Sequence, residues 1–348
     1  MPEANQTAWR ELMQPTDAPA SDHVEITELP QRRVIVVGGS EARDFLHAIL
    51  SQDIEAIEDD TARFAALCSA KGRALGLLRV VTDGDRVLLV TRADLAEGLL
   101  KRLKLYVLRR DVTLDLADDQ SAIGVTWPTE ARTDCPFADP DACAALARLV
   151  RASPSRGHLP AAVDESGRLY LREDLGGDLR VAIHAPIAAL AALVSTAEGA
   201  AVVTATAWER AAIEDRVPEI SGETTEHYVP QWINLDDLEA FSLKKGCYPG
   251  QEVIARMHYL GKPNRRLFAG HVLGTASPTP GAAVTNTSDQ TAGELVRSAP
   301  LPDGSGSRVL VVIKLKHLHD PLVVEGGTLS LDPDDLAEDA PRTADARH

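Results

Sequence analysis

Cysteine is scarce in this sequence, and the four that occur form no ligand pattern. They are Cys68, Cys135, Cys143 and Cys247, with no C-x-x-C pair among them. Cys135 and Cys143 lie eight residues apart, a spacing that matches no common zinc or iron–sulfur site. A disulfide scaffold is not expected in a chain of 348 residues without a secretion signal. We therefore expect no metal site and small buried or incidental thiols at Cys68, Cys135 and Cys143; Cys247 is considered separately below.

Long hydrophobic runs are also missing. No apolar stretch reaches the ~18 residues that a membrane span needs, and residues 1–22 lack the charged-then-apolar pattern of a signal peptide. Hydrophobic residues make up 44% and charged residues 25%, which is typical of globular proteins and excludes collagen, coiled coils and bulk disorder. We therefore expect a cytoplasmic protein of two or three domains without membrane contact.

Positive charge is in deficit: 36 Lys and Arg stand against 52 Asp and Glu, a net charge of −16. Residues 1–30 contribute −5 and residues 331–348 contribute −4, so the two ends carry 9 of the 16 excess negative charges. Both ends are rich in Pro, Asp and Ala without periodicity, so we expect disordered tails at residues 1–25 and 332–348. Because phosphate binding needs a positive field, a broad nucleic-acid surface and direct DNA binding are not expected, although a local basic patch is compatible with the charge.

Helical and strand patterns alternate irregularly, which indicates an α+β fold rather than regular βαβ repeats. Strands are predicted at 33–38, 64–68, 74–81, 86–90, 112–116, 122–126, 169–172 and 180–183, and helices at 40–50, 95–106, 186–194 and 205–214. Residues 71–73 form a predicted turn, and the turn Asp83-Gly84-Asp85 predicts that the strands at 74–81 and 86–90 pair as a hairpin. From residue 267 to 331, short β-rich runs alternate with Gly and Pro turns, which predicts a small antiparallel barrel.

The most unusual segment is KKGCYPGQE, residues 244–252. Glycines flank Cys247 and allow close backbone approach, while Pro249 can open a helix. Cys247 therefore precedes a predicted helix N-terminus and follows Lys245 by two residues, and both features favour the thiolate. Such a thiolate can be a nucleophile, a metal or cluster ligand, or a redox thiol. A tightly packed turn that accepts only a small side chain explains the pattern equally well.

Charge also distinguishes this region, because residues 244–266 sum to +5 in a chain of −16. Such a segment suits an anionic ligand or partner, and the alternative is a solvated basic face. Upstream, Trp208 is either a core residue or a stacking platform for a heteroaromatic ring. Glu214 is either an exposed helix-end acid or a carboxylate that accepts two N–H groups of an amino-pyrimidinone.

Several motifs together resemble one known family. They comprise residues 245–252 (KGCYPGQE), Ala255-Arg256 and residues 261–266 (GKPNRR), preceded by Ile213-Glu214, Pro218, residues 229–231 and Asn234-Leu235, and earlier by Phe45-Leu46, residues 51–53, residues 71–73, Tyr106 and Arg109. They resemble the YgfZ family of folate-binding proteins, which is related to the T-protein (aminomethyltransferase) of the glycine cleavage system. The resemblance covers residues 30–330, and its eight-residue cysteine motif is highly specific.

The resemblance implies a multi-lobed, aminomethyltransferase-like folate-binding fold around a central hole that holds tetrahydrofolate. Residues 26–264 would form two intertwined lobes, and residues 265–331 the C-terminal β-barrel. The implied role is that of an auxiliary factor for iron–sulfur cluster assembly or repair, which indirectly supports tRNA modification by cluster enzymes. Its partners would be iron–sulfur proteins or cluster-assembly proteins.

Site residues follow from the resemblance and from the chemistry above. Cys247 and Lys245 are the candidate catalytic residues, and the candidate folate-binding residues are Trp208, Glu214, Tyr248, Gln251, Glu252, Arg256, Arg265 and Arg266. The arginines would pair with the carboxylates of the glutamate tail. The sequence departs from the family at two places: Arg32 or a neighbour replaces a first-strand tryptophan, and Asp215-Arg216 replace a glycine.

Two other functions remain open from the sequence. Kinship with the T-protein permits a folate-dependent aminomethyltransferase or demethylase, although fold alone does not determine function. The cysteine motif argues against this, because T-protein chemistry relies on an acid. The third hypothesis is a non-catalytic scaffold that binds a cluster-assembly partner through the basic segment.

Overall fold

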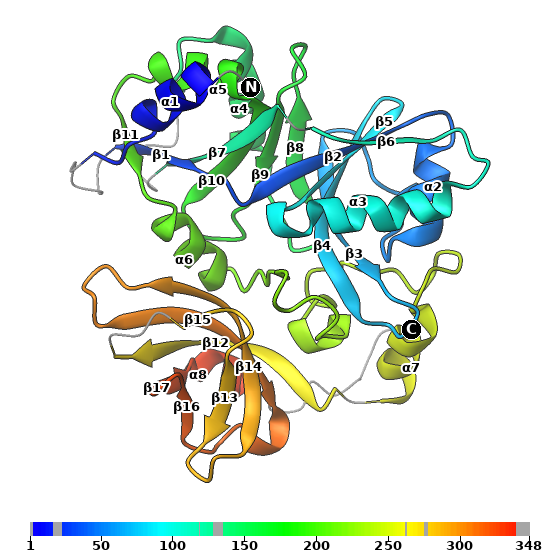
Figure 1. Ribbon diagram of the computed structural model, residues 1–348, viewed down its shortest axis with the longest axis vertical. Helices are drawn as coiled ribbons and strands as arrows, with labels where there is room; N and C mark the ends of the chain where they lie inside the picture. Colours follow the sequence, from blue (N-terminus) through cyan, green and yellow to red (C-terminus); the bar gives the residue numbers. More distant parts are fainter. Residues whose placement is uncertain are drawn as a thin grey trace.

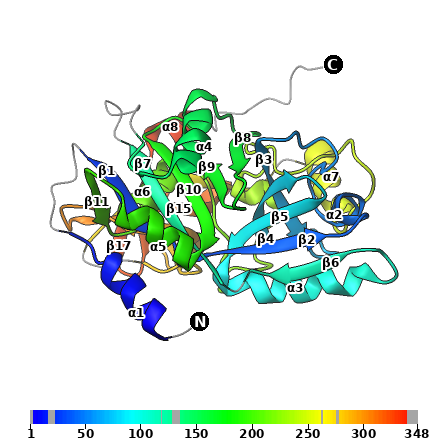
Figure 2. The same cartoon turned by 90° about the horizontal axis from the view of Figure 1, so that it is seen from above.

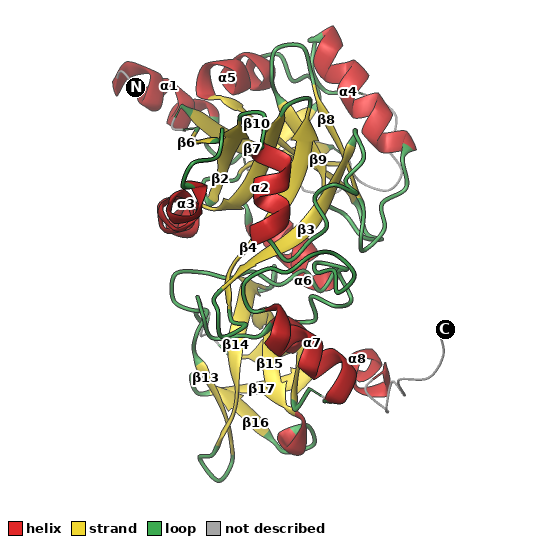
Figure 3. Cartoon of the chain, turned by 90° about the vertical axis from the view of Figure 1, so that its right-hand side faces the viewer, coloured by secondary structure: helices red, strands yellow, loops and turns green. Residues whose placement is uncertain are grey.

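Two lobes that share one sheet lie above a closed barrel in the computed structural model (Figure 1). The structure describes residues 3–16, 23–117, 119–127, 135–261, 263–274 and 278–338. The sheet has eleven strands in the order β11-β1-β7-β10-β9-β8-β3-β4-β5-β2-β6. Helices lie on the outside of the lobes, and the barrel lies below the sheet when the molecule is turned by 90° (Figure 3). None of the described helices combines the length and apolar character that crossing a bilayer requires.

The first lobe is built from two stretches of chain, because the polypeptide leaves it after β1 and returns at β7. Its elements are α1 (Glu3–Leu12), β1 (Val24–Glu28), β7 (Gln120–Trp127), α4 (Pro140–Arg151), β8 (Leu159–Val163), β9 (Leu169–Arg172), β10 (Leu179–Pro186), α5 (Ile187–Ser195) and β11 (Ala200–Val203). Helix α4 begins where its sequence favours it: Pro140 occupies the first turn, and the Asp139 carboxylate accepts a hydrogen bond from the Ala142 N–H at 2.9 Å.

The second lobe lies between those two stretches. It contains β2 (Arg32–Gly38), α2 (Ala42–Ile49), β3 (Thr61–Cys68), β4 (Ala74–Asp83), β5 (Arg86–Arg92), α3 (Ala93–Val107) and β6 (Thr113–Leu116). The predicted hairpin between β4 and β5 is confirmed, with Asp83 opposite Arg86 and Gly84 at a φ of 56° in the turn. The pairing of β3 with β8 joins the two lobes into one sheet.

A long connection then leads to the barrel. It contains α6 (Thr206–Glu214), the 3-10 helix η1 (Pro230–Ile233) and α7 (Gln251–Leu260). The barrel comprises β12 (Arg265–Leu273), β13 (Ala283–Asn286), β14 (Thr291–Pro300), β15 (Gly306–Lys314), η2 (Leu315–His317), β16 (Leu322–Val324) and β17 (Gly327–Leu331), followed by α8 (Pro333–Glu338). Its closed order, β12-β15-β14-β13-β16-β17, confirms the predicted antiparallel barrel.

The predicted disorder at the two ends is wrong for the parts that the structure describes. Helix α1 projects beside the first lobe (Figure 2). Trp9 is buried, and its indole N–H donates to the Glu28 carboxylate at 2.7 Å. At the other end, Asp332 accepts hydrogen bonds from Arg308 on β15. Acidic composition suggested solvated tails, but one docked indole and one ion pair offset the cost of ordering each segment.

The cysteines differ in part from the prediction. Cys135 and Cys143 form a disulfide, with their Cα atoms 5.4 Å apart, so the expectation of two free thiols is wrong. The chain turns back at Phe137, which packs into the core of the first lobe and brings the start of α4 beside Cys135. Cys68 is a buried thiol, as predicted, and burial raises its pKa to about 12.

A buried group of charged residues lies where the two lobes meet the connection to the barrel. The guanidinium of Arg32 lies 3.3 Å from the Glu173 carboxylate and 3.5 Å from that of Glu219, and Arg79 lies 2.8 Å from Glu173. Burial alone would raise the pKa of the Glu173 carboxyl, but Arg32 and Arg79 hold it well below its usual value. Arg32 of the second lobe therefore joins the two lobes through its ion pair with Glu173.

His184 on β10 is a fully buried neighbour of this group. Burial, opposed in part by the Glu173 charge, lowers the pKa of its imidazole to about 3. The ring is therefore neutral in the folded protein at physiological pH, and the folded protein binds a proton at His184 much more weakly than the unfolded chain does.

Stability should consequently depend on pH through His184. Between pH 6.5 and about 3 the unfolded chain binds a proton at this site and the folded chain does not, so the free energy of unfolding decreases as the pH falls below 6.5. From about pH 7 to about pH 5 we expect wild type to lose about 2 kcal/mol more than His184→Gln. Urea unfolding at the two pH values measures this difference, and equal losses in both proteins would contradict it.

Candidate functional site

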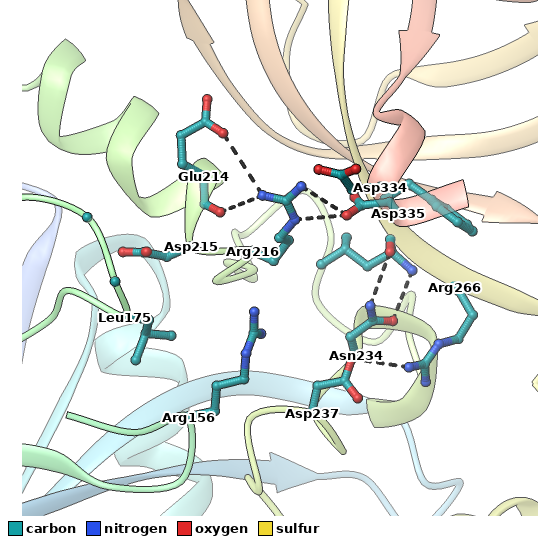
Figure 4. Close-up of a pocket in the computed structure, with 14 residues that line it drawn as sticks. Arg156, Leu175, Glu214, Asp215, Arg216, Asn234, Asp237, Arg266, Asp334 and Asp335 are labelled. Atoms are coloured by element: carbon teal, nitrogen blue, oxygen red, sulfur yellow. Dashed lines mark hydrogen bonds and ion pairs between the residues drawn. The ribbon is translucent and has the colours of Figure 1, made fainter. Parts of the chain in front are cut away.

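A cleft of about 610 Å³ lies where the first lobe, the connection and the barrel meet (Figure 4). The loop between β9 and β10 lines one side, and β12 and α8 line another. The end of α6 and the turn after η1 complete it. Its lining residues are Arg156, Leu175, Gly176, Gly177, Glu214, Asp215, Arg216, Asn234, Asp237, Arg266, Leu267, Phe268, Asp334 and Asp335.

Glu214 ends α6 at the edge of this cleft, and Arg308 of the barrel holds it in place. Both carboxylate oxygens of Glu214 accept hydrogen bonds from Arg308, each at 2.7 Å. The same guanidinium donates to Asp332, which follows β17. Burial opposes the charge of Arg308, but its hydrogen bonds to Asp332 and Glu214 raise its pKa above the ordinary value. The predicted acid is therefore fixed by a bidentate pair and still about half exposed.

The turn after Glu214 keeps a glycine-like backbone without a glycine. Arg216 has a φ of 54°, in the left-handed region that glycine adopts without strain. Its guanidinium donates to Asp332 and Asp335, each at 3.0 Å. Asp215 points to the buried guanidinium of Arg180. Arg216 thus adopts a left-handed turn without a glycine, and two ion pairs join this turn to Asp332 after β17 and to Asp335 on α8.

Arg265 and Arg266 are neighbours in the sequence and lie on opposite faces of β12, because successive side chains of a strand alternate. Arg266 lines the cleft and donates to Asp236 at 2.8 Å and to Asp237 at 3.3 Å. Arg265 stacks over Trp232 with its Cζ atom 4.4 Å from the ring centroid. Only Arg266 belongs to the cleft.

Trp208 is a core residue, in agreement with the first of its two interpretations. It is 2% exposed and is not among the residues that line the cleft. A Cβ atom added to Gly124 would lie 2.5 Å from its ring, so β7 approaches the indole closely. Arg180 lies 5.2 Å from the ring centroid. The indole therefore attaches α6 to the sheet instead of stacking on a ligand in the cleft.

Cys247 is a free and exposed thiol in the loop before α7. Helix α7 begins at Gln251, so the predicted position ahead of a helix N-terminus is confirmed. Gly250 has a φ of 82°, and a Cβ atom there would lie 2.6 Å from the carbonyl oxygen of Ser69. The loop is thus seated on the turn between β3 and β4, and Cys247 is not among the residues that line the cleft.

Lys245 faces inward, toward the end of α2. Its ammonium donates to the carbonyl oxygens of His47, Leu50 and Gln52 and lies 4.9 Å from the ring centroid of Tyr248. Burial lowers its pKa to about 8. A cation at a helix C-terminus is stabilising, so the geometry supports a role for Lys245 in positioning the Cys247 loop.

The other predicted residues are spread along this segment. Tyr248 is buried, whereas Gln251, Glu252 and Arg256 lie on α7 outside the cleft lining, and Glu252 and Arg256 are exposed. The basic residues of segment 244–266 therefore do not form one continuous surface. Lys262, which contributed to its charge, lies outside the described residues.

Of the ten predicted site residues, the structure brings Glu214 and Arg266 together in the cleft. Arg156, Phe268 and Asp334 also line it, and sequence reasoning did not identify them. They come from a loop, a barrel strand and a helix that approach one another only in the folded chain. Asn234, which occurred in the family motif, holds β12 through two hydrogen bonds of 3.1 Å with the Leu267 backbone. Across the described part of the chain, no group of three or more His, Cys, Asp or Glu residues is arranged to hold a metal ion.

Comparison with known proteins confirms the resemblance seen in the sequence. Proteins named tRNA-modifying protein YgfZ from Sodalis glossinidius and Escherichia coli O157:H7 are each 29% identical, over 75% and 77% of this chain and 76% and 77% of theirs. That of Colwellia psychrerythraea is 26% identical over 70% of both chains. No protein-family model matches the chain.

The aminomethyltransferase-like fold is confirmed by a solved structure. The glycine cleavage system aminomethyltransferase T from Bartonella henselae aligns with a TM-score of 0.67 over 93% of this chain and 88% of its own. The two sequences are 16% identical. This likeness establishes the fold and leaves the chemistry to the residues of the site.

The accessibility of the cysteines gives a direct test of this arrangement. With a thiol reagent and no reductant, we expect one reactive cysteine in the native protein, Cys247, and a second, Cys68, only after denaturation. Reduction of the denatured chain should release Cys135 and Cys143 and bring the total to four. Mass spectrometry of the alkylated peptides identifies each site. Labelling of Cys68 in the native state would contradict its burial.

Proposed function

We propose that this protein binds a reduced folate in the cleft and supports tRNA modification by assisting iron–sulfur enzymes, with Cys247 as its reactive thiol. The observation that carries the proposal is the position of Glu214, a carboxylate held at the edge of a cleft that Arg266 also lines. The names of the similar YgfZ proteins support the link to tRNA modification.

The residues of the cleft fit the two ends of a folate. A pterin presents parallel N–H groups, which the Glu214 carboxylate can accept, and the partly exposed Leu175 offers apolar contact. The glutamate tail carries carboxylates, which suit guanidinium groups. Arg156 is exposed, points into the cleft (Figure 4) and forms no ion pair with the residues that the structure describes. We assign the tail to Arg156 and the pterin to the side of Glu214.

Cys247 acts in this proposal on a partner protein, because its thiol is exposed on a loop that does not line the cleft. Folate binding and thiol chemistry are then separate tasks of one chain. An exposed thiol ahead of a helix N-terminus is suited to transient bonding with a cluster or with another thiol. A one-carbon transfer needs the reacting groups within contact of the pterin, so Cys247, which does not line the cleft, would take no part in such a transfer.

Folate binding should depend on the charge of Glu214. We expect Glu214→Gln to weaken tetrahydrofolate binding about tenfold, because the neutral amide replaces a charge-assisted pair of hydrogen bonds. Glu97→Gln, an exposed acid on α3, is the matched control and should bind as wild type does. Isothermal titration calorimetry measures all three proteins. The folate proposal is lost when wild type does not bind or when the two variants have equal affinity.

The thiol should be needed for function and not for folate binding. In cells that depend on this protein, we expect Cys247→Ser to reduce the tRNA modifications made by iron–sulfur enzymes at least several-fold, as measured by mass spectrometry of nucleosides. Gly246→Ala changes the same loop, keeps the sulfur and meets no neighbouring atom, so it should retain them. Full modification in the serine variant would rule out the assigned role of Cys247.

A further inference from the structure

Two arginines from distant parts of the chain stack on one half-buried tryptophan. The Cζ atoms of Arg73 and Arg265 lie 4.7 and 4.4 Å from the ring centroid of Trp232. Arg73 ends the turn between β3 and β4, Trp232 belongs to η1, and Arg265 begins β12. The indole holds both guanidinium planes in place, so neither must be ordered when a ligand binds.

Lysines extend this group into a patch. Lys71 lies in the same turn as Arg73. Lys314 on β15 lies opposite Arg265 on β12 in the strand register, and Lys316 follows in η2. We call these five cations and Trp232 the arginine patch. Burial, together with the charges of Arg265 and Lys316, lowers the pKa of Lys314, which shows how close these like charges are.

The charge of the patch is not neutralised within the described residues. None of its five cations forms an ion pair there, although most other arginines of the chain do. Arg73 donates to the carbonyl oxygen of His227 at 2.6 Å, and Lys314 to that of Thr291 at 2.6 Å. The nearby Glu294 carboxylate accepts instead from Tyr228 at 2.6 Å. Gathering unpaired cations is costly, and an anionic ligand would relieve this repulsion.

The patch also adjoins the loop of Cys247. A Cβ atom on Gly72 would lie 2.6 Å from the Val253 side chain and 3.2 Å from the carbonyl oxygen of Gly250. Gly72 and Gly250 therefore lie in contact. Arg73 follows Gly72 directly, and Gly250 follows Cys247 by three residues. Gln231 strengthens this junction, since its side-chain amide donates to the Ile254 carbonyl oxygen at 2.9 Å.

We propose that the arginine patch binds the phosphate backbone of an RNA strand. Guanidinium groups match phosphate oxygens bidentately, and lysines add point charges along the path. In a chain of −16, an extended polyanion is repelled by much of the surface, which favours contact at a local group of unpaired cations such as this patch. The choice of RNA over an acidic protein rests on the proposed role in tRNA modification. The binding would place RNA beside the exposed thiol.

The test is the salt dependence of binding to an unmodified tRNA transcript, followed by fluorescence anisotropy of the labelled RNA between about 50 and 200 mM salt. We expect the double variant Arg73→Gln/Arg265→Gln to bind at least about tenfold more weakly, with a salt slope shallower by about 2, because two phosphate contacts are lost. Arg102→Gln, an exposed cation on α3, should behave as wild type does. Thermal unfolding verifies that each variant is folded. If the double variant is unfolded, Lys71→Gln/Lys316→Gln, which changes two exposed side chains, should show a loss in the same direction.

Three results would overturn the inference: no binding by wild type, equal binding by the double variant, or displacement of the RNA by a polyglutamate peptide at equal charge concentration. The last would assign the patch to an acidic protein. Tetrahydrofolate calorimetry on the same double variant separates the two proposals. If the double variant binds folate normally but has lost RNA binding, the result supports both the folate proposal and the RNA proposal. If wild type does not bind folate and the double variant still loses RNA binding, the RNA proposal stands and the folate proposal is wrong.

Discussion

The cleft depends on helix α6 being held by both of its faces. On one face Trp208 packs against Gly124 of the sheet. On the other, Glu209 pairs with Arg297 at 2.7 Å and Glu214 with Arg308 at 2.7 Å, so two barrel strands hold the helix. Since one short helix joins the lobes to the barrel, the side chains that face the cleft from α6 and from β12 are kept in a fixed relation. The ion pairs form between partly buried partners, where charge-assisted hydrogen bonds are stronger than at an open surface.

Local patterns in the sequence were sufficient to predict much of this arrangement. The barrel followed from short alternating strands between Gly and Pro turns, and the β4–β5 hairpin from Asp83-Gly84-Asp85. Glu214 was identified as a ligand candidate at a helix end, where the structure has it. Arg265 and Arg266 were taken as equivalent. The alternation of side chains along β12 separates them, and this was not predictable without knowing where the strand begins.

The remaining differences come from contacts between segments distant in the sequence. Acidic composition pointed to a disordered N-terminus, whereas the docking of Trp9 against Glu28 orders α1. The disulfide of Cys135 and Cys143 depends on the path of the chain through Phe137, which spacing does not reveal. Likewise, the indole of Trp208 is equally compatible with a core and with a stacking platform until Gly124 is seen to approach it. In each case one tertiary contact outweighs the local propensity.

Because the thiol of Cys247 does not line the cleft, a ligand bound in the cleft does not touch it directly. Lys245 anchors its loop to the end of α2 and Gly250 seats the loop on the β3–β4 turn, so Cys247 is fixed to the second lobe, while Glu214 and Arg266 lie between the first lobe and the barrel. The connection that contains η1 runs from the cleft, which Asn234 and Asp237 line, to the loop of Cys247. That connection packs on α7 through Gln231 and on the barrel through Asn234. Ligand binding that stiffens the Asn234 turn would also hold η1 and α7 in place, and the loop of Cys247 would be steadier in the ligand-bound protein than in the free one.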